Sequence, residues 1–333
     1  MKSGFYKRLT AIFAAIASVA LICASFSCKT YSKELKDGQS SLHEEESCTV
    51  TFTDVGEGDC IYISLPDGKN LLIDCGEKTE ENLRAVRKAI KLSGRVDIDY
   101  LVLTHADSDH TGGAEDVINE FPVKNAFVPS VLFKNSFPSF AKAEAALVKC
   151  GATINVSAEY RTVKSENFFF TFLSPEPAGF GDSAYADFNA TATPGENARN
   201  GISAVIYLEV FGVRFLFTGD AGVGSEKKIL ANYVAGTYDL AAKTKVNLNA
   251  VDFLKVAHHG SDDASSAEFL KVLQPRNAVI SCGLNYYGHP STETLKRIIE
   301  ANENAAIFRT DVCGSVRVSV LKSGAYEIST EEK

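Results

Sequence analysis

The sequence predicts an α/β fold of four layers, an αββα sandwich in which two β-sheets pack face to face and helices cover the outside. Two observations predict this fold class. Short β-rich runs outnumber the helical segments, and both kinds of segment recur in each half of the chain. Residues with metal-binding side chains also follow several of the expected strands, which indicates a site built at the rim of the two sheets.

In the first half of the chain, three β-rich runs precede alternating helices and strands. Pro66-Asp67-Gly68-Lys69 joins the second and third runs as a hairpin turn. If Asp67 and Gly68 form a two-residue loop, Cys60 lies directly opposite Cys75. The two sulfurs are then neighbours, with or without a disulfide bond between them. The expected strands are residues 49–54, 60–65, 70–74, 98–104 and 126–129, and the expected helices are residues 79–92, 114–120 and 139–149.

Capping residues mark several helix ends. Glu80 and Glu81 favour the positive end of the first helix, and Gly151 ends the third. In the second half, Ser225 is expected to cap a helix. The second half has expected strands at residues 168–173, 204–210, 213–218, 251–257 and 278–282, and expected helices at 225–234, 264–273 and 291–301.

One long segment interrupts this alternation. Residues 174–203 are rich in Gly, Ala, Asp, Asn and Pro and show no clear periodicity. A segment of that length inside a compact domain is typical of a lid, a binding loop or a disordered stretch.

The N-terminus differs in kind from the rest. Basic Lys2, Lys7 and Arg8 precede an uncharged apolar run, residues 9–24, as in a secretory signal, although a retained membrane anchor is the alternative. Residues 25–28 end in Cys28 and resemble a bacterial lipoprotein cleavage site, so membrane attachment through lipidated Cys28 competes with ordinary cleavage nearby. The predicted domains are a signal peptide at 1–28, a polar tether at 29–47 and a hydrolase domain at 48–333.

The net charge of −8 at pH 7 argues against one class of function. Removal of a signal peptide with three basic residues makes the remaining chain more acidic still. An acidic protein repels phosphate backbones, so a tight, sequence-independent nucleic-acid binder is not expected, although an enzyme with a local basic cleft remains compatible.

The most informative motif directly follows the expected strand 98–104. Residues 104–113 read Thr-His-Ala-Asp-Ser-Asp-His-Thr-Gly-Gly, so four side chains with lone pairs crowd into six residues: His105, Asp107, Asp109 and His110. Two imidazoles and two carboxylates in so small a volume need a cation for compensation. The alternative, a solvated acidic loop, accounts for the glycines but not for the His-x-Asp-x-Asp-His pattern.

Further candidate ligands follow other strands. Asp74 ends the run 70–74, Gly219-Asp220 follows 213–218, and His258-His259-Gly260-Ser261 follows 251–257. A single Asp after a strand is commonly only a turn former, but several such groups at separate strand ends indicate one metal site. His289, in Tyr-Gly-His-Pro, is either a site residue or a turn residue.

These motifs together resemble the metallo-β-lactamase-fold superfamily. Asp54-Val55-Gly56-Glu57-Gly58-Asp59, the Asp at 107 and Tyr-Gly-His-Pro at 287–290 are similar to the hydrolase domain of ComEC-type competence proteins. The resemblance covers about residues 49–320. The membrane channel of those proteins has no counterpart in this sequence, so the resemblance leaves the substrate open.

The resemblance implies a binuclear metal centre. One metal would bind His105 and Asp107, the other would bind Asp109, His110 and one of His258 or His259, and Asp220 would bridge them. His259 is the expected ligand of the two, because the metal-binding histidine of the superfamily commonly precedes glycine. Because Asp107 and Asn200 stand where the superfamily usually has His, the first metal site has harder ligands, and manganese is expected beside zinc as an occupant. The resemblance further implies that His258, His289, Asn200 and Ser261 face the substrate, and that Asp74, Asp54 and Asp59 orient the ligands.

The resulting prediction is an exported, binuclear metal-dependent hydrolase. A phosphodiester is the expected substrate, either extracellular nucleic acid or a phosphorylated cell-wall component, because two cations suit in-line displacement at phosphorus. One alternative is a β-lactam or lactone hydrolase, and another is a non-catalytic surface lipoprotein that keeps the fold. No protein partner is predicted.

Overall fold

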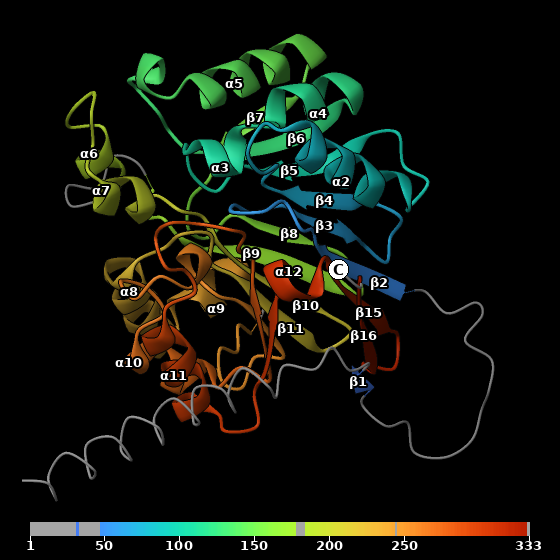
Figure 1. The fold of residues 1–333 in the computed structure, drawn as a ribbon, viewed down its shortest axis with the longest axis vertical. Coiled ribbons are helices and arrows are strands. Elements are labelled where there is room, and N and C mark those ends of the chain that lie inside the picture. The colour runs from blue at the N-terminus through green and yellow to red at the C-terminus, as the bar shows by residue number, and fades with distance from the viewer. Residues whose placement is uncertain (1–30, 33–46, 178–183, 244, 332–333) are drawn as a thin grey trace, which may run out of the picture.

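A computed structural model describes residues 31–32, 47–177, 184–243 and 245–331. It confirms the expected αββα sandwich (Figure 1). The predicted signal peptide and Cys28 lie outside the described residues. Within the described part of the chain, no helix combines the length and apolar character that crossing a bilayer requires.

The first sheet has nine strands in the order β1-β16-β15-β2-β3-β4-β5-β6-β7. It is antiparallel from β1 to β4 and parallel from β4 to β7. Its strands are β1 Tyr31–Ser32, β2 Ser47–Phe52, β3 Ile61–Ser64, β4 Asn70–Ile73, β5 Ile98–Val102, β6 Val123–Val128, β7 Thr153–Val156, β15 Val316–Leu321 and β16 Tyr326–Thr330.

The second sheet has seven strands in the order β14-β13-β12-β11-β10-β9-β8. Strands β8 to β11 are antiparallel, and β11 to β14 are parallel, so the predicted hairpin between β10 and β11 is confirmed. Its strands are β8 Thr162–Lys164, β9 Phe168–Ser174, β10 Val205–Val210, β11 Val213–Phe217, β12 Phe253–Lys255, β13 Asn277–Ile280 and β14 Ala306–Arg309.

Helices cover the outer faces of both sheets. In Figure 1, α2, α4 and α5 lie over the first sheet, and α8, α10 and α11 lie over the second. The helices are α2 Glu80–Lys91, α3 Ser108–Thr111, α4 Ala114–Glu120, α5 Pro138–Cys150, α6 Ala184–Phe188, α7 Glu196–Gly201, α8 Val223–Val234, α9 Thr237–Ala242, α10 Ala267–Leu273, α11 Thr292–Ala301 and α12 Thr310–Cys313, with short 3₁₀ turns at Lys134–Ser136 and His258–Gly260.

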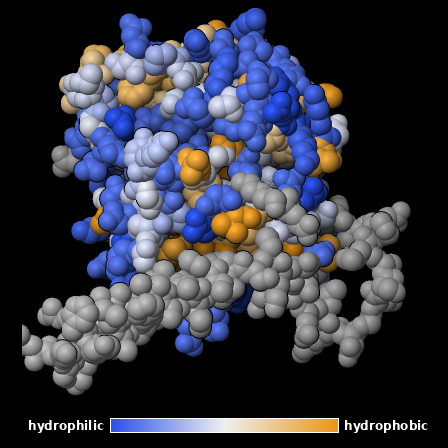
Figure 2. All heavy atoms as spheres, viewed as in Figure 1, coloured by the Kyte–Doolittle hydropathy of each residue, from blue (hydrophilic) through white to orange (hydrophobic). Residues whose placement is uncertain are grey.

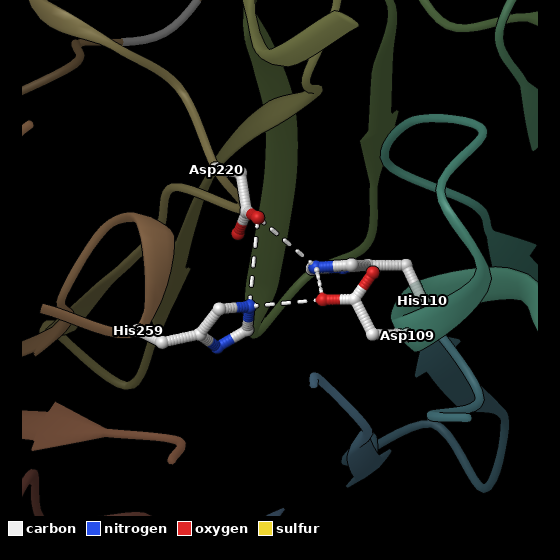
Figure 3. Close-up of side chains that lie close together, drawn as sticks. All are labelled: Asp109, His110, Asp220 and His259. Carbon is white, nitrogen blue, oxygen red and sulfur yellow. Dashed lines mark ion pairs between the residues drawn. The ribbon is translucent and has the colours of Figure 1, made fainter. Parts of the chain in front are cut away.

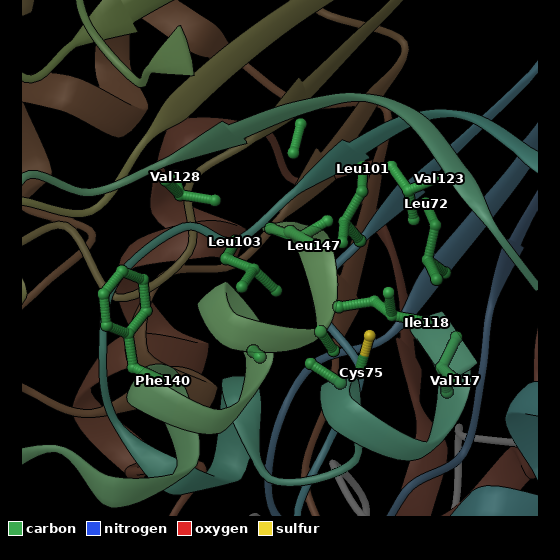
Figure 4. Packing of buried hydrophobic residues seen from close by; sticks show 14 of the residues in the cluster. Leu72, Cys75, Leu101, Leu103, Val117, Ile118, Val123, Val128, Phe140 and Leu147 are labelled. Atoms are coloured by element: carbon green, nitrogen blue, oxygen red, sulfur yellow. The ribbon is translucent and has the colours of Figure 1, made fainter. Parts of the chain in front are cut away.

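The apolar residues form three buried layers. The layer between the sheets is rich in phenylalanine, including Phe52, Phe172 and Phe217. A second layer packs α2, α4 and α5 onto the first sheet (Figure 4), and a third packs α8, α10 and α11 onto the second. Outside the grey atoms, the face shown in Figure 2 is mostly hydrophilic, with hydrophobic residues in separate small patches. Burial of apolar area in these three layers is the main force that holds the sandwich together.

The helix ends follow the expected capping chemistry in most cases. Thr79 caps α2 by accepting a hydrogen bond from the Asn82 N–H at 3.1 Å, and Gly151 ends α5 with a φ of 79°. The prediction for Ser225 is wrong. This residue lies inside α8, whose N-cap is Gly222, because the helix begins one turn earlier than the position of the serine suggests.

The β3–β4 hairpin corrects the predicted register. Ser64 pairs with Asn70 and Leu65 N–H donates to Lys69 O at 2.8 Å, so the loop has three residues rather than two. Gly68, with a φ of 77°, takes the left-handed position of such a loop. Continuing this register puts Asp74, not Cys75, opposite Cys60. Cys60 and Cys75 are both buried free thiols.

The long segment 174–203 is partly helical where the structure describes it. Helix α6 buries Tyr185 and Phe188 in the layer beneath α5, which ties the segment to the first sheet. Helix α7 follows, and it carries Arg199 and Asn200 toward the loop after β5, where Arg199 contacts Asp107. The expectation of a stretch without regular structure is therefore corrected: buried aromatic side chains order its second half.

Candidate metal centre

The candidate site lies where strands of both sheets end. Strands β4 and β5 are parallel neighbours in the first sheet, and β11 and β12 are parallel neighbours in the second, so each pair ends at one sheet edge. Asp74 follows β4, the loop of His105 to His110 follows β5, Asp220 follows β11 and His259 follows β12. The two edges meet, and this brings residues from both halves of the chain together.

Four of the predicted ligands form one compact cluster (Figure 3). Nε2 of His110 lies 3.3 Å from Oδ2 of Asp220 and 3.6 Å from Oδ2 of Asp109. Nε2 of His259 lies 3.2 Å from the same Asp109 oxygen and 3.5 Å from the same Asp220 oxygen. All four ligand atoms lie within 4.8 Å of one another, a spacing that a single cation can span.

The two remaining predicted ligands are placed differently. Nε2 of His105 lies 3.8 Å from Oδ2 of Asp220, and its ring centroid is 4.1 Å from that of His110. Asp107 instead accepts a hydrogen bond from Nε of Arg199 at 2.9 Å. The carboxylate of Asp107, which the sequence assigned to the first metal, is thus paired with the guanidinium of Arg199. Arg199 was missed in the sequence because it lies in the long segment that showed no periodicity.

Each of the three histidines makes a contact through Nδ1, the ring nitrogen on the side away from the cluster. Nδ1 of His110 bonds to Oδ2 of Asp74 at 2.8 Å, and Nδ1 of His259 bonds to the carbonyl of Ser281 at 2.9 Å. A carbonyl only accepts, so the Nδ1 of His259 carries a proton and a neutral ring presents its Nε2 lone pair to the cluster. Nδ1 of His105 lies 3.1 Å from Oγ1 of Thr104. This outer bonding is the arrangement that orients metal-binding imidazoles.

Asp74 is itself fixed in place. Its two oxygens accept from N–H and Oγ1 of Thr104 at 2.8 and 2.7 Å. The side chain is fully buried, and the backbone has a φ of 57°. Asp74 therefore links the end of β4 to the ligand loop after β5.

The donor set fits a divalent cation. Nε2 of His105, His110 and His259 and Oδ1 of Asp220 are buried and have no hydrogen-bond partner. A buried polar atom without a partner costs free energy, and three such imidazole nitrogens around the Asp220 carboxylate indicate a site for a metal rather than for water alone. Imidazole with carboxylate suits zinc, and the carboxylates also suit manganese.

The charges of the side chains depend strongly on one another. Burial lowers the pKa of His105, and the charge of the neighbouring His110 lowers it further. Burial alone would also lower the pKa of His110 and His259, but the carboxylates, led by Asp220, outweigh it. They raise the pKa of His110 well above its ordinary value and that of His259 to about 10. A cation entering the cluster therefore displaces protons from these rings.

A buried ion pair that the sequence did not predict lies beside the cluster. Nζ of Lys255, in β12, is 2.6 Å from Oδ2 of Asp59 and 3.7 Å from Oδ1 of Asp220, and it donates to the carbonyl of Gly219 at 3.0 Å. Lys255 is 0% exposed. In the sequence, the only indication of this ion pair was a lysine within the expected strand 251–257, since its partner Asp59 lies almost 200 residues away.

The loop that carries Asp59 packs on the ligand loop. The N–H of Asp59 donates to the carbonyl of Asp109 at 3.3 Å. A Cβ on Gly58 would lie 2.2 Å from that carbonyl oxygen, and Gly58 has a φ of 128°, so only glycine fits there. Asp54, expected to orient a ligand, accepts a hydrogen bond from the N–H of Gly56 in its own loop at 3.3 Å.

The residues expected to face the substrate lie around His258. Nδ1 of His258 is 3.0 Å from Oδ1 of Asp263 and 3.4 Å from Nδ2 of Asn200. The ring of His289 lies 5.4 Å from that of His258. Ser261 has a structural contact as well, because its carbonyl accepts from Oγ1 of Thr294 at 2.7 Å.

Comparison with known proteins agrees with this geometry. Residues 53–145 match the model of the metallo-beta-lactamase superfamily. The ComE operon protein 3 of Bacillus subtilis is 28% identical over 284 residues, which cover 80% of this chain and 32% of the relative. The competence protein ComA of Neisseria gonorrhoeae is 27% identical, with 84% of this chain and 33% of the relative covered. The chain thus spans about a third of the length of these relatives.

A solved structure shares the fold. CmlA, a diiron β-hydroxylase from Streptomyces venezuelae, superposes with a TM-score of 0.50 and 12% identity, over 84% of this chain and 54% of CmlA. At this identity the likeness concerns the fold alone. The resemblance inferred from the motifs is confirmed, and the chain has the metallo-β-lactamase fold with a His/Asp cluster able to hold metal ions.

Proposed function

We propose that this chain is a metal-dependent hydrolase that cleaves phosphodiesters with two divalent cations. One observation carries the proposal: the buried, unpartnered Nε2 atoms of three histidines face Asp220 at the meeting edge of the two sheets. The family match supports a hydrolase. The substrate class is our inference from the chemistry of the donor set.

In this proposal the two cations share Asp220. Asp109, His110 and His259 would hold one, and His105 and Asp107 would hold the other. When bound, two divalent cations lower the pKa of a water and neutralise charge on phosphoryl oxygens. Zinc and manganese are both compatible with imidazole and carboxylate ligands.

Arg199 supplies a further positive charge at the Asp107 end of the site. Its side chain is one-third exposed and lies beside Asp107. Guanidinium groups bind phosphoryl oxygens through paired hydrogen bonds. We therefore assign Arg199 to holding a non-bridging oxygen of the substrate.

His258 is the group best placed to move a proton. It lies next to His259, outside the cluster, and Asp263 accepts a hydrogen bond from its Nδ1 at 3.0 Å. With the proton on Nδ1, the amide of Asn200 must turn its oxygen toward this ring, because two donors cannot bond to each other. The other nitrogen, Nε2, lies 3.4 Å from Oε1 of the exposed Glu196 and would exchange a proton with the leaving oxygen.

The proposed location is the cell surface. The basic residues before an apolar run and the cysteine at 28 support export with attachment through lipidated Cys28. Labelled palmitate should be incorporated into the wild-type chain and not into Cys28→Ser. Secretion of an unlabelled wild-type chain would favour ordinary cleavage.

A substrate panel tests the proposed activity. The purified protein is treated with a chelator, reloaded with zinc or manganese, and assayed on bis-p-nitrophenyl phosphate and on the β-lactam nitrocefin. The proposal expects phosphodiester hydrolysis that requires the added metal. Hydrolysis of nitrocefin alone would favour the lactam alternative, and metal binding without any turnover would favour a binding protein.

A further inference from the structure

Loop 283–290 presents an unusual group of exposed side chains. Leu284 and Tyr286 are fully exposed, and Tyr287 is 80% exposed. Single exposed apolar residues are ordinary on protein surfaces. Three within four residues, beside a candidate catalytic site, indicate a surface for a ligand.

The loop holds these side chains on an ordered backbone. Oδ1 of Asn285 accepts hydrogen bonds from the N–H groups of Tyr287, Gly288 and His289 at 3.1, 2.9 and 3.0 Å. Its Nδ2 donates to Glu57 and to the carbonyls of Gly283 and His289. The side-chain amide therefore folds the loop around itself.

Glu57 ties the loop to the metal centre. Its Oε2 accepts from the N–H of Gly283 at 3.0 Å, and its Oε1 lies 3.3 Å from Nδ1 of His289. A Cβ on Gly283 would lie 2.5 Å from the N of Glu57, so the two loops are in direct backbone contact. Glu57 belongs to the same loop as Asp59, which packs against the ligand loop at Asp109.

A succession of rings connects the exposed tyrosine to the ligands. The ring of Tyr287 stacks on that of His289 with centroids 5.7 Å apart and an interplanar angle of 27°. His289 lies 5.4 Å from His258, which lies 6.1 Å from His259. Only three ring-to-ring steps thus separate Tyr287 from a member of the metal cluster.

From this arrangement we infer that Tyr286 and Tyr287 form a stacking platform for an unpaired nucleobase next to the scissile phosphodiester. The inference rests on the proposed phosphodiesterase function and names its substrate class. Stacking on an aromatic side chain accepts any base, because every base has a π-face. A paired base has its faces covered by neighbours in the duplex, so the platform selects single-stranded substrate.

The charge distribution favours stacking over backbone attraction. Acidic Glu57, Glu196 and Asp263 lie beside His258 or His289, so this side of the site repels phosphates. The whole chain carries a net charge of −8. Affinity for a strand must then come from the cations at the scissile phosphate and from uncharged stacking, which predicts short substrates and a shallow salt dependence.

A pair of oligonucleotides tests the platform. One is hexathymidylate, and the other has the same phosphodiesters with tetrahydrofuran in place of every nucleoside. The wild type should cleave hexathymidylate with a kcat/KM about tenfold or more above that of the abasic strand, the range that one stacked base supplies. This ratio should fall toward one in the double variant Tyr286→Ala/Tyr287→Ala and persist in Tyr286→Phe/Tyr287→Phe, which keeps both rings.

A control and a binding measurement sharpen the test. Val234→Ala, which removes an exposed apolar side chain on α8, should keep the ratio. Anisotropy of fluorescein-labelled hexathymidylate on metal-free wild-type protein, which does not turn the strand over, should show tighter binding than the abasic strand, and the double alanine change should abolish the difference.

The failures are distinguishable. Equal cleavage of both strands by the wild type, or an unchanged ratio in the double alanine variant, would overturn the platform alone. Loss of vesicle binding or of self-association in that variant, with the ratio kept, would likewise assign the tyrosines to a membrane or a second copy. Failure to cleave either strand or bis-p-nitrophenyl phosphate would overturn the proposed function itself.

Discussion

The ammonium of Lys255 lies 2.6 Å from Oδ2 of Asp59, and both side chains are buried beside the metal cluster. The amine also approaches Oδ1 of Asp220 at 3.7 Å. Lys255 is therefore a fixed cation that compensates carboxylates from both halves of the sandwich. Burial alone would lower the pKa of this amine, but Asp59 and Asp220 raise it, so the amine is charged.

The first prediction concerns the stability of this pair. Lys255→Met leaves Asp59 buried without its partner, and breaking a buried pair in this way costs about 3–5 kcal/mol. Urea unfolding of metal-free protein measures the loss. The matched control is Lys88→Met, whose exposed pair with Glu331 contributes about 1 kcal/mol or less. Equal stabilities of the two variants would contradict the assignment.

The second prediction concerns pH. His110 and His259 have raised pKa values in the folded chain, that of His259 being about 10, against about 6.5 when unfolded. Their contribution to stability is fully present below pH 6.5 and is lost as the pH rises toward the folded values. Between about pH 6.5 and 8.5, the free energy of unfolding of the metal-free protein should fall by about 1.4 kcal/mol per pH unit for each proton that the folded chain binds in excess of the unfolded chain. This interval lies below the range of ordinary thiol ionisation.

Denaturation at several pH values with the metal removed checks this dependence. His259→Gln should flatten the slope, because one of the two titrating rings is gone. An unfolding free energy of the wild type that rises over this interval would contradict the raised pKa values of His110 and His259.

The third prediction concerns Asp74. Asp74→Asn keeps an acceptor for Thr104 but removes the charge that orients and polarises His110. Metal affinity, measured by competition with a chromophoric chelator, should fall about 10–100-fold, as it does when such outer partners are lost. Affinity equal to that of the wild type would mean that the Asp74–His110 contact does not act on the metal.

The fourth prediction concerns Arg199. Its guanidinium and a cation compete for Asp107, so Arg199→Met should tighten the binding of the second metal equivalent while weakening phosphodiester binding. Isothermal titration with zinc and manganese separates the two equivalents. Arg84→Met, on the exposed side of α2, serves as the control. A second equivalent that binds more weakly in Arg199→Met would show that the arginine supports the metal rather than competing with it.

The sequence predicted much of the fold because local chemistry specified it. Thr79 and Gly151 mark helix ends, and the ligand motifs follow strands that end at one rim, so the sandwich and the cluster of His110, Asp220 and His259 could be anticipated. The hairpin register could not, since Pro66-Asp67-Gly68 is compatible with loops of two or three residues that differ by one step along the strand.

Ion pairs between residues far apart in the sequence could not be predicted either. The pairing of Lys255 with Asp59 and of Arg199 with Asp107 depends on how two sheets and a short helix meet. No spacing in the sequence records such a contact. The ordered loop around Asn285 was missed for a similar reason, because its fixing partner, Glu57, lies in a loop of the other half of the chain.

The most direct test of the metal-dependent phosphodiesterase uses Asp220→Ala. The variant and the wild type are loaded with zinc or manganese, their metal content is counted after dialysis, and turnover of bis-p-nitrophenyl phosphate is compared, with Asp116→Ala on α4 as the control. Because Asp220 contacts His105, His110 and His259, its removal should lower the metal content and abolish turnover while the far-ultraviolet circular dichroism stays the same. Wild-type turnover in a metal-replete Asp220→Ala sample would contradict the account.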